Sequence, residues 1–251
     1  MNLENYYYFF KSAIDPDTCK KIIDLGLAQM QSDKDLGINV EAYTDGNREK
    51  SSNPDAVPQG EHSKQQLLGQ GLKKAYVRDS TVSWLNDQWI YDLFYPYIRM
   101  ANKQAGWQWQ WDNSEHFQFT VYEPGQFYSW HRDGFSDHHN VYKRYLYGQT
   151  PIPLSPKGNL PPGYTTNPSL VGKLRKISMT VNLNVPGDYD GGNLKFDFGQ
   201  HTDGAQFYEC EEIRPQGSII IFPSFLDHCV TPVTSGTRYS LVLWCVGDPY
   251  K

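Results

Sequence analysis

From Trp107 onward the sequence is a succession of short segments in which apolar and polar residues alternate, with turn sequences between them. This alternation is typical of β-strands that bury one face. The predicted strands cover residues 116–122, 126–131, 176–185, 193–198, 206–213, 218–222, 229–233 and 238–246. About eight strands at this spacing predict a jelly roll built from two antiparallel sheets.

Residues 1–106 are expected to support this core with two helices and short strands. A strand is predicted over 6–10 and another over 76–84, and Asp15 followed by Pro16 predicts the start of a helix. Apolar residues at helical spacing form the expected buried stripe of this helix: Cys19, Ile22, Ile23, Leu27 and Met30. The polar residues 32–71 are expected to form a long surface loop.

A second helix is predicted to begin at Asp87, since apolar residues recur at helical spacing from Ile90 to Ala101. Pro96 is expected to kink this helix or to end its first half. The whole chain, residues 1–251, is therefore expected to be a single domain, mainly β with flanking helices (α+β). Residues 107–251 form its predicted jelly-roll core, and residues 136–173 interrupt that core.

The interruption at 136–173 is rich in proline, glycine and tyrosine and is too long for an ordinary connection. A lid, a binding loop or an oligomer contact are the three interpretations of it.

Composition limits the partners. The net charge of −5 argues against a general affinity for nucleic acid or anionic membranes. No apolar run is long enough to span a bilayer, and no secretory signal is visible.

The four cysteines lack C-x-x-C spacing, which argues against a structural zinc site and for four reduced thiols in a cytoplasmic protein. Cys229 follows a candidate ligand, His228, but neighbours on a strand face opposite ways, so Cys229 should point away from it. Arg132 should point to the surface for the same reason. Gly191 and Gly192 are expected to form a hairpin turn. The alternating tryptophans at 107, 109 and 111 are expected to form one strand face, in the core or at an interface.

The residues that carry chemistry are His131, Asp133, His228 and Arg238. Two histidines and one carboxylate are the ligands of a facial triad, which holds Fe(II) and leaves positions open for reaction. His131 and Asp133 are two residues apart on a predicted strand, so their side chains should face the same way. Arg238, expected on the strand after His228, offers a charged fork for the far carboxylate of a dicarboxylate co-substrate. These residues predict an iron- and 2-oxoglutarate-dependent oxygenase.

The C-terminal half also resembles a known family. The segments that carry the resemblance are ISMTVNLN (177–184), DYDGGNL (188–194), GSIIIFPS (217–224), HCVTPV (228–233), GTRYS (236–240) and Trp244. Together they are similar to the prolyl 4-hydroxylase-type 2-oxoglutarate oxygenases, and most of all to the bacterial PKHD-type hydroxylases. The resemblance covers residues 118–246.

This resemblance implies a double-stranded β-helix in which His131, Asp133 and His228 bind Fe(II) and are the catalytic centre. It implies that Arg238 pairs with the C5 carboxylate of 2-oxoglutarate. Further expected co-substrate contacts are Tyr122, Asn182, which stands where some members have a tyrosine, Thr180 and Trp244. O2 is the second co-substrate, and ascorbate is a candidate accessory. Related halogenases lack the carboxylate at the position of Asp133, so its presence argues for hydroxylation.

The implied function is hydroxylation of an unactivated C–H bond in a protein or peptide, with proline or another side chain as the target. A free amino acid or another small molecule is an alternative substrate. A non-catalytic jelly-roll module that binds a metal or ligand is an alternative of a different class. A nucleic-acid demethylase would carry a second arginine where Trp244 stands, and a zinc hydrolase has no use for Arg238. The oligomeric state is left open.

Overall fold

The structure is a computed structural model that describes residues 5–45, 76–134, 140–150, 154, 160–161, 163–199 and 206–250. Within these residues the α-helices are α1 (Pro16–Asp35) and α3 (Gln88–Gln104). The strands of the N-terminal half are β1 (Tyr8–Phe10), β2 (Glu41–Asp45), β3 (Tyr76–Leu85), β4 (Asn113–Ser114), β5 (Phe117–Tyr122) and β6 (Phe127–His131). Those that follow are β7 (Lys143–Arg144), β8 (Tyr164–Thr165), β9 (Leu174–Asn182), β10 (Tyr189–Gly191), β11 (Leu194–Asp197), β12 (Phe207–Glu209), β13 (Ile219–Pro223), β14 (Asp227–Val230), β15 (Val233–Gly236) and β16 (Arg238–Gly247).

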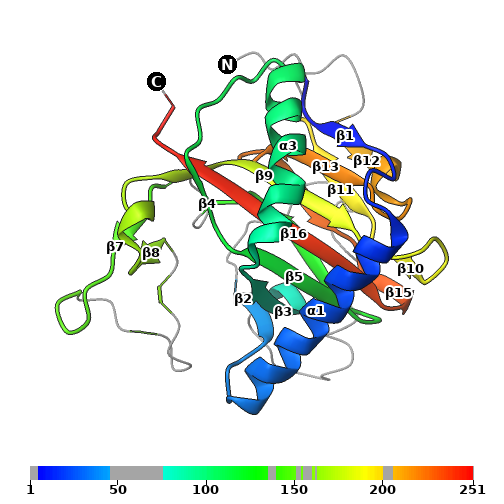
Figure 1. Ribbon diagram of the computed structural model, residues 1–251, viewed down its shortest axis with the longest axis horizontal. Helices are drawn as coiled ribbons and strands as arrows, with labels where there is room; N and C mark the ends of the chain where they lie inside the picture. Colours follow the sequence, from blue (N-terminus) through cyan, green and yellow to red (C-terminus); the bar gives the residue numbers. More distant parts are fainter. Residues whose placement is uncertain are drawn as a thin grey trace.

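Twelve of these strands pair into one curled antiparallel sheet, in the order β1-β13-β9-β16-β5-β3-β6-β14-β11-β12, with β2 on β3 and β4 on β16 (Figure 1). A separate antiparallel pair joins β10 to β15. The prediction of a mainly β jelly roll with flanking helices is confirmed. The N-terminal segment contributes more than support, because β3 lies between β5 and β6 within the sheet.

Residue alternation gives each central strand two different faces. In β5, Phe117, Phe119 and Val121 belong to the main apolar core, whereas Gln118, Thr120 and Tyr122 line a cavity on the opposite face. Strands β9 and β16 alternate in the same way, with the cavity on the same side. The period of two therefore assigns apolar side chains to the helix-covered face and functional candidates to the concave face.

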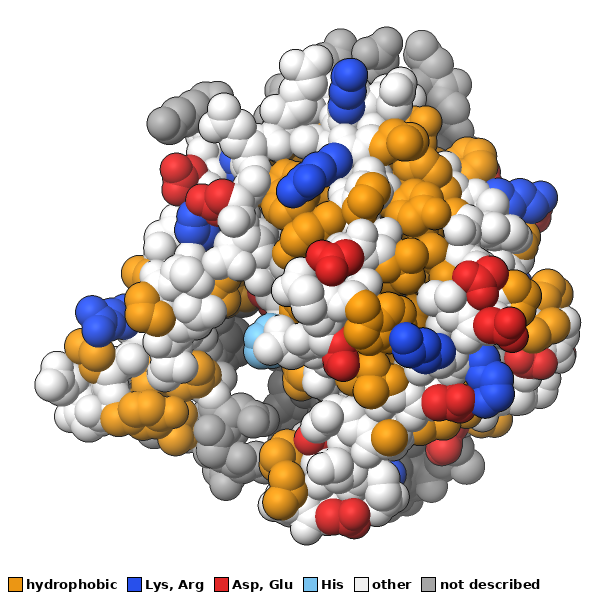
Figure 2. Space-filling view, in the orientation of Figure 1, with side chains coloured by type: hydrophobic (Ala, Val, Ile, Leu, Met, Phe, Trp, Pro, Cys, Tyr) orange, Lys and Arg blue, Asp and Glu red, His pale blue; other side chains and the backbone are white. Residues whose placement is uncertain are grey.

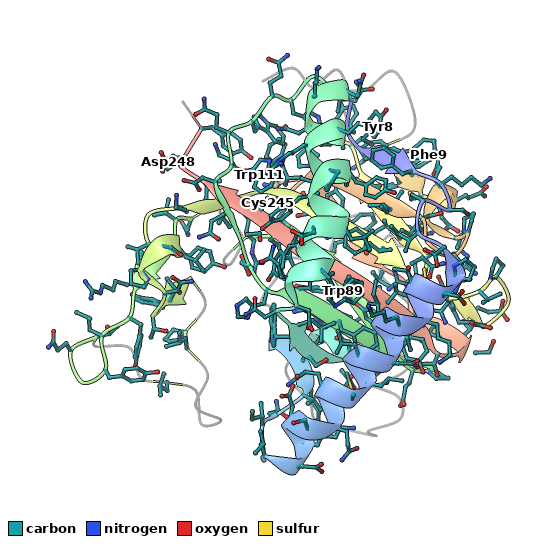
Figure 3. All side chains as sticks on the ribbon, viewed as in Figure 1. Tyr8, Phe9, Trp89, Trp111, Cys245 and Asp248 are labelled. Carbon is teal, nitrogen blue, oxygen red and sulfur yellow. The ribbon has the colours of Figure 1, made fainter. Side chains whose placement is uncertain are left out.

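Helices α1 and α3 cover the apolar face of the sheet (Figure 1). Asp15 caps α1 by accepting a hydrogen bond from the backbone N–H of Thr18 at 2.9 Å, and Pro16 occupies the first turn, as predicted. The two helices also meet each other, since Nζ of Lys21 lies 4.0 Å from the ring of Trp89 on α3 (Figure 3). Burial of the shared face is the main stabilising contribution.

Three local predictions are wrong. Leu27 does not join the buried stripe of α1, since its side chain is 40% exposed and Gly26 is buried instead. Part of the predicted loop 32–71 is regular, because α1 runs to Asp35 and β2 pairs with β3; residues 46–71 lie outside the described residues. The tryptophans at 107, 109 and 111 do not form a strand, because Gln108 has a φ of 53°, which interrupts extended backbone.

Helix α3 continues through Pro96 instead of ending there. Phe94 and Ile98, on either side of it, are fully buried, and this packing holds the helix together despite the missing backbone donor. The predicted strand 206–213 is shorter than expected, because a 3-10 turn at Glu211–Ile213 follows β12.

The predicted interruption at 136–173 contains the short parallel pair of β7 and β8 and a 3-10 turn at Pro168–Leu170. Figure 1 shows this pair on an arm beside the main body. Residues 135–139, 151–153, 155–159 and 162 lie outside the described residues. The arm is tied to the body by Tyr142, whose hydroxyl donates to Glu115 Oε1 at 2.5 Å.

All four cysteines are buried free thiols, which agrees with the expected absence of disulfides. Burial raises the pKa of Cys19 to about 11 and that of Cys229 to about 12, so these thiols stay protonated at neutral pH. Neither α1 nor α3 has the length and apolar character needed to cross a membrane.

Candidate functional site

His131 and His228 face each other on neighbouring strands. His131 is the last residue of β6, and the antiparallel register places it directly opposite His228 of β14. Asp133 was predicted to lie on the same strand, but it lies in the turn just beyond β6. A backbone hydrogen bond from Asp133 N to Ser224 O, at 2.8 Å, holds this turn. Pairing of distant segments thus brings the three predicted ligands together.

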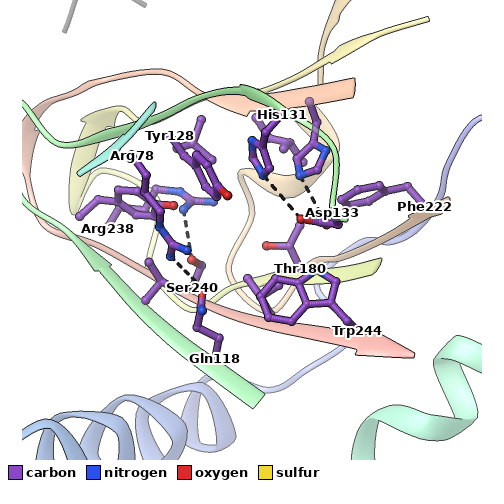
Figure 4. A pocket seen from close by; sticks show the side chains of 16 residues that line it. Arg78, Gln118, Tyr128, His131, Asp133, Thr180, Phe222, Arg238, Ser240 and Trp244 are labelled. Carbon is purple, nitrogen blue, oxygen red and sulfur yellow. Dashed lines mark hydrogen bonds and ion pairs between the residues drawn. The ribbon is translucent and has the colours of Figure 1, made fainter. Parts of the chain in front are cut away.

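The three side chains form one compact cluster (Figure 4). Oδ1 of Asp133 lies 3.5 Å from Nε2 of His131, and Oδ2 lies 3.6 Å from Nε2 of His228. One ligand atom from each residue lies within 4.8 Å of the other two. Each of the three residues is at most 9% exposed, so the cluster is shielded from water.

Backbone carbonyls orient both imidazoles. Nδ1 of His131 lies 2.8 Å from Ser129 O, and Nδ1 of His228 lies 2.9 Å from Leu226 O. A carbonyl can only accept, so Nδ1 carries the proton and Nε2 keeps its lone pair. Both lone pairs are directed to the space beside Asp133, as metal ligation requires.

The electrostatics of the cluster favour a neutral His131 beside an ionised Asp133. Burial, and then the neighbouring His228, lower the pKa of His131 to about 4. Burial opposes ionisation of Asp133, but His228 and His131 outweigh it and hold the pKa of this carboxyl well below its usual range. Two imidazoles and one carboxylate on one side of a cavity fit a divalent metal, and Fe(II) is the ion typical of this ligand set.

Arg238, the first residue of β16, lines the same cavity and is only 2% exposed. Its Nη1 donates to Ser240 Oγ at 3.2 Å, and its guanidinium carbon lies 5.3 Å from the ring centre of Tyr122. In the described part of the chain its buried Nε has no hydrogen-bond partner. Strand β16 does not pair with β14, since β5, β3 and β6 lie between them. The curl of the sheet therefore brings Arg238 into the same cavity as the ligands on the β6 and β14 side.

Three further candidates, Tyr122, Thr180 and Trp244, also line the cavity. The indole N–H of Trp244 is a second buried donor that has no acceptor among the described residues. Unpaired buried donors at Arg238 and Trp244 are costly in the free protein and leave hydrogen-bonding capacity for a ligand.

Asn182 does not line the cavity. It lies two residues after Thr180 and so shares the inward parity of β9, but it ends the strand and does not line the cavity. Its Nδ2 donates to the backbone carbonyls of Arg214, at 2.8 Å, and Asn184, at 3.3 Å. The carboxamide therefore holds the following turn, and it is not available to a ligand in the cavity.

Sequence reasoning missed several lining residues, chiefly Arg78, Gln118 and Tyr128. The ring of Tyr128 stacks on the imidazole of His131, with ring centres 3.4 Å apart. What the sequence did not show was that β3 lies inside the core sheet.

Two predictions about neighbours of the ligands can be compared with the structure. Arg132 points away from the cluster and forms an ion pair with Asp227, with Nη2 2.7 Å from Oδ2, as predicted. The hairpin prediction for Gly191 and Gly192 is wrong. Gly191 belongs to β10 and pairs with Val233 of β15 through an irregular register, and Gly192 follows beside Arg238.

A jelly-roll sheet with a buried cluster of two histidines and one carboxylate, and with a buried arginine in the same cavity, defines the class of non-haem iron oxygenases. Comparison with known proteins gives the family. The family model described as the 2OG-Fe(II) oxygenase superfamily matches residues 117–246, just over half of the chain. The chain belongs to this superfamily.

Curated relatives match over a shorter stretch. A PKHD-type hydroxylase of Synechococcus sp. (strain JA-2-3B'a(2-13)) is 43% identical over 78 residues, which are 30% of this chain and 32% of the relative. The PKHD-type hydroxylase YbiX of Escherichia coli O9:H4 (strain HS) is 39% identical over 70 residues, 27% of each chain. The match thus spans about a third or less of these relatives' length.

Solved structures share the fold along most of the chain. The viral collagen prolyl hydroxylase vCPH of Paramecium Bursaria Chlorella virus-1, in its 2OG complex, has a TM-score of 0.53 and 16% identity, and the match covers 97% of both chains. A prolyl-4-hydroxylase of Pseudomonas putida has a TM-score of 0.51 and 16% identity, with 95% of this chain and 91% of that one covered. At this identity the likeness shows the fold alone.

Proposed function

We propose that this protein is an Fe(II)- and 2-oxoglutarate-dependent dioxygenase that hydroxylates an unactivated C–H bond in a protein or peptide, with a prolyl side chain as the first candidate. The observation that carries this proposal is the burial of His131, Asp133, His228 and Arg238 in one cavity. When bound, Fe(II) with 2-oxoglutarate and O2 supplies the oxidising power for hydroxylation, and 2-oxoglutarate leaves as succinate and CO2.

The chain's own residues account for binding and orientation. His131 and His228 would hold the metal through Nε2, and Asp133 through its carboxylate. Arg238 would bind the C5 carboxylate of 2-oxoglutarate by charge-assisted hydrogen bonds. Tyr122, which lies against the Arg238 guanidinium, would fix that end further.

The cavity wall would control what else enters. Thr180 and the indole N–H of Trp244 would donate hydrogen bonds to bound co-substrate. Leu194, Phe222 and Val230 supply apolar wall. Exclusion of water by such a wall strengthens each polar contact and limits uncoupled side reactions.

A peptide substrate is supported by a second, open hollow of about 740 Å3 between the start of α3, β4 and the arm. Figure 2 shows the molecule hollowed between its main body and the arm that carries β7 and β8. The hollow is lined by aromatic and polar side chains, among them Trp84, Tyr91 and Tyr142. Trp84 packs against Trp244 of the neighbouring cavity, with ring centres 6.3 Å apart.

The test is succinate formation by purified protein with Fe(II), 2-oxoglutarate and O2, with and without ascorbate. Proline-containing peptides and free amino acids are compared as stimulators, and the product is examined by mass spectrometry for one added oxygen atom. Asp133→Ala should abolish succinate formation, and Arg238→Ala should require far more 2-oxoglutarate. Arg99→Gln removes an exposed arginine of α3 as the control.

The outcomes separate the alternatives. Stimulation by peptides, with oxygen added to the peptide, supports the proposal. Stimulation by free amino acids alone would replace the peptide with a small-molecule substrate. Absence of succinate under every condition, in protein that retains no iron anaerobically, would instead indicate a binding module without catalysis.

A further inference from the structure

A second buried arginine shares the cavity with Arg238. Arg78, on β3, is 7% exposed and lines the cavity from a different strand. Its Nε donates to Ser80 Oγ at 2.8 Å, and its Nη2 donates to Gln118 Oε1 at 2.8 Å. In the described part of the chain, Nη1 of Arg78 is left without a hydrogen bond.

The two arginines come from the strands on either side of β5. Gln118, the acceptor of Arg78, is also within 3.3 Å of Thr120 Oγ1. Ser240, the acceptor of Arg238, lies directly opposite Thr120 in the register of β16 and β5. Figure 4 shows Arg78 and Arg238 together on the side of the cavity away from Asp133.

Among the described residues, neither cation has a counter-charge. Their hydrogen-bond acceptors, two serines and a glutamine, are neutral, and neither guanidinium has an ion pair with a carboxylate in the described part of the chain. Asp133 is the only acidic residue among the described residues that line the cavity, and its two oxygens face the histidines. Two buried like charges without an anion are costly, so their placement favours a ligand that brings one.

We propose that Arg78 and Arg238 form a two-arginine clamp on the C5 carboxylate of 2-oxoglutarate; this inference rests on the proposed function. A carboxylate offers about four acceptor sites, enough for the free edges of both forks. Ser80 and Gln118 already fix the guanidinium of Arg78, so little further ordering of this side chain is needed when the ligand binds. The clamp makes Arg78 a specificity-determining residue that selects 2-oxo acids with a distal carboxylate.

The experiment measures binding without turnover. Protein loaded with Mn(II) under anaerobic conditions is titrated by calorimetry with 2-oxoglutarate and with 2-oxopentanoate, which has the same chain length and no distal carboxylate. The variants are Arg78→Gln and Arg78→Lys, with Arg99→Gln as a charge-matched control at an exposed position. Circular dichroism and thermal unfolding report whether each variant is folded.

Arg78→Gln should weaken binding of 2-oxoglutarate by about 10- to 100-fold, the range for loss of hydrogen bonds to a charged group. Binding of 2-oxopentanoate should stay as in the wild type. Arg78→Lys keeps the charge but lacks the forked guanidinium, so it should lose less affinity for 2-oxoglutarate. It also replaces Arg78→Gln as the test if that variant does not fold. Arg99→Gln should bind both acids normally.

Equal weakening for both acids would assign Arg78 a structural role and overturn the clamp. Unchanged binding of 2-oxoglutarate in a folded Arg78→Gln protein would overturn it as well. If the wild type itself binds neither acid, the proposed function fails first and the clamp falls with it. The wild-type protein therefore tests the proposed function, and the Arg78 variants test the clamp.

Discussion

Gly192 lies directly against the side chain of Arg238. A Cβ atom on Gly192 would stand 2.9 Å from Cδ of Arg238 and 3.0 Å from Cγ2 of Val233. Gly192 also has a φ of +58°, in the left-handed region that glycine adopts at little cost. The buried position of Arg238 thus depends on a residue that bears no functional group.

Gly192→Ala should displace Arg238 and raise the KM for 2-oxoglutarate by about tenfold, the effect of one weakened charge-assisted hydrogen bond. The measurement is succinate formation against 2-oxoglutarate concentration. Gly37→Ala is the matched control, because Gly37 has a φ of +72° and nothing within 4 Å of a Cβ atom. Gly37→Ala should have the same backbone strain and leave the KM for 2-oxoglutarate unchanged. An unchanged KM in folded Gly192→Ala protein would contradict the packing argument.

Much of the site could be predicted from sequence because local rules control it. The family resemblance named Tyr122, Thr180, Arg238 and Trp244, and the period of two along β5, β9 and β16 explains why all four lie on the same side as the cavity. The resemblance also named Asn182, which has the same parity, but the strand ends there and its side chain binds the backbone of the next turn. Parity predicts a face of a strand, and it does not predict what a side chain at the strand's end will bind.

The parts that escaped prediction depend on which strands are neighbours. Nothing in the sequence near Arg78 shows that β3 inserts between β5 and β6, and this pairing alone carries Arg78 into the cavity. The role of Gly192 is hidden for the same reason, because a pair of glycines reads as a turn until Arg238 is placed beside it. Both positions depend on pairing between strands that are distant in the sequence, which local sequence patterns do not reveal.

Glu115 connects the arm to the body through buried polar contacts. It accepts from Arg175 Nε at 2.5 Å and Nη2 at 2.7 Å, and from Tyr142 of the arm. Glu115→Gln should lower the free energy of unfolding by about 3–5 kcal/mol, since it leaves the Arg175 cation buried without its carboxylate. Urea denaturation measures this change.

The control for Glu115 is an ion pair on the surface. Asp24→Asn breaks the exposed contact of Asp24 with Lys20, whose atoms lie 2.6 Å apart, and should cost less than about 1 kcal/mol. If Glu115→Gln cost no more than Asp24→Asn, the buried contacts of Glu115 would not contribute to stability as argued.

Gly26 lets α1 approach the sheet closely. A Cβ atom there would stand 2.3 Å from the ring of Phe119, which is fully buried. Gly26→Ala should therefore destabilise the protein by about 1–3 kcal/mol through overpacking, although alanine favours helices by about 1 kcal/mol. The control is Ala28→Gly at an exposed position of α1, which should cost only about 1 kcal/mol. Greater stability of Gly26→Ala in thermal unfolding would contradict this packing.

The burial of His131 predicts a pH dependence of stability in the metal-free protein. Its pKa is about 4 when folded, against an ordinary value of 6.5, so between these values the unfolded chain binds a proton that the folded protein does not. The free energy of unfolding should therefore fall as the pH is lowered from about 6.5 towards 4, by on the order of 1–3 kcal/mol. Asp133, whose pKa is lowered, loses its stabilising contribution in a more acidic range, below its unfolded value of about 3.8.

Urea unfolding at a series of pH values between 4 and 7, in the presence of a chelator, measures this dependence. His131→Gln should flatten the curve between about pH 4 and 6.5, because the titrating group is gone. His116→Gln, which replaces an exposed histidine, should leave the curve as in the wild type. If the slope survives in His131→Gln, another group takes up the proton on unfolding, and His131 is not held neutral by its burial beside His228.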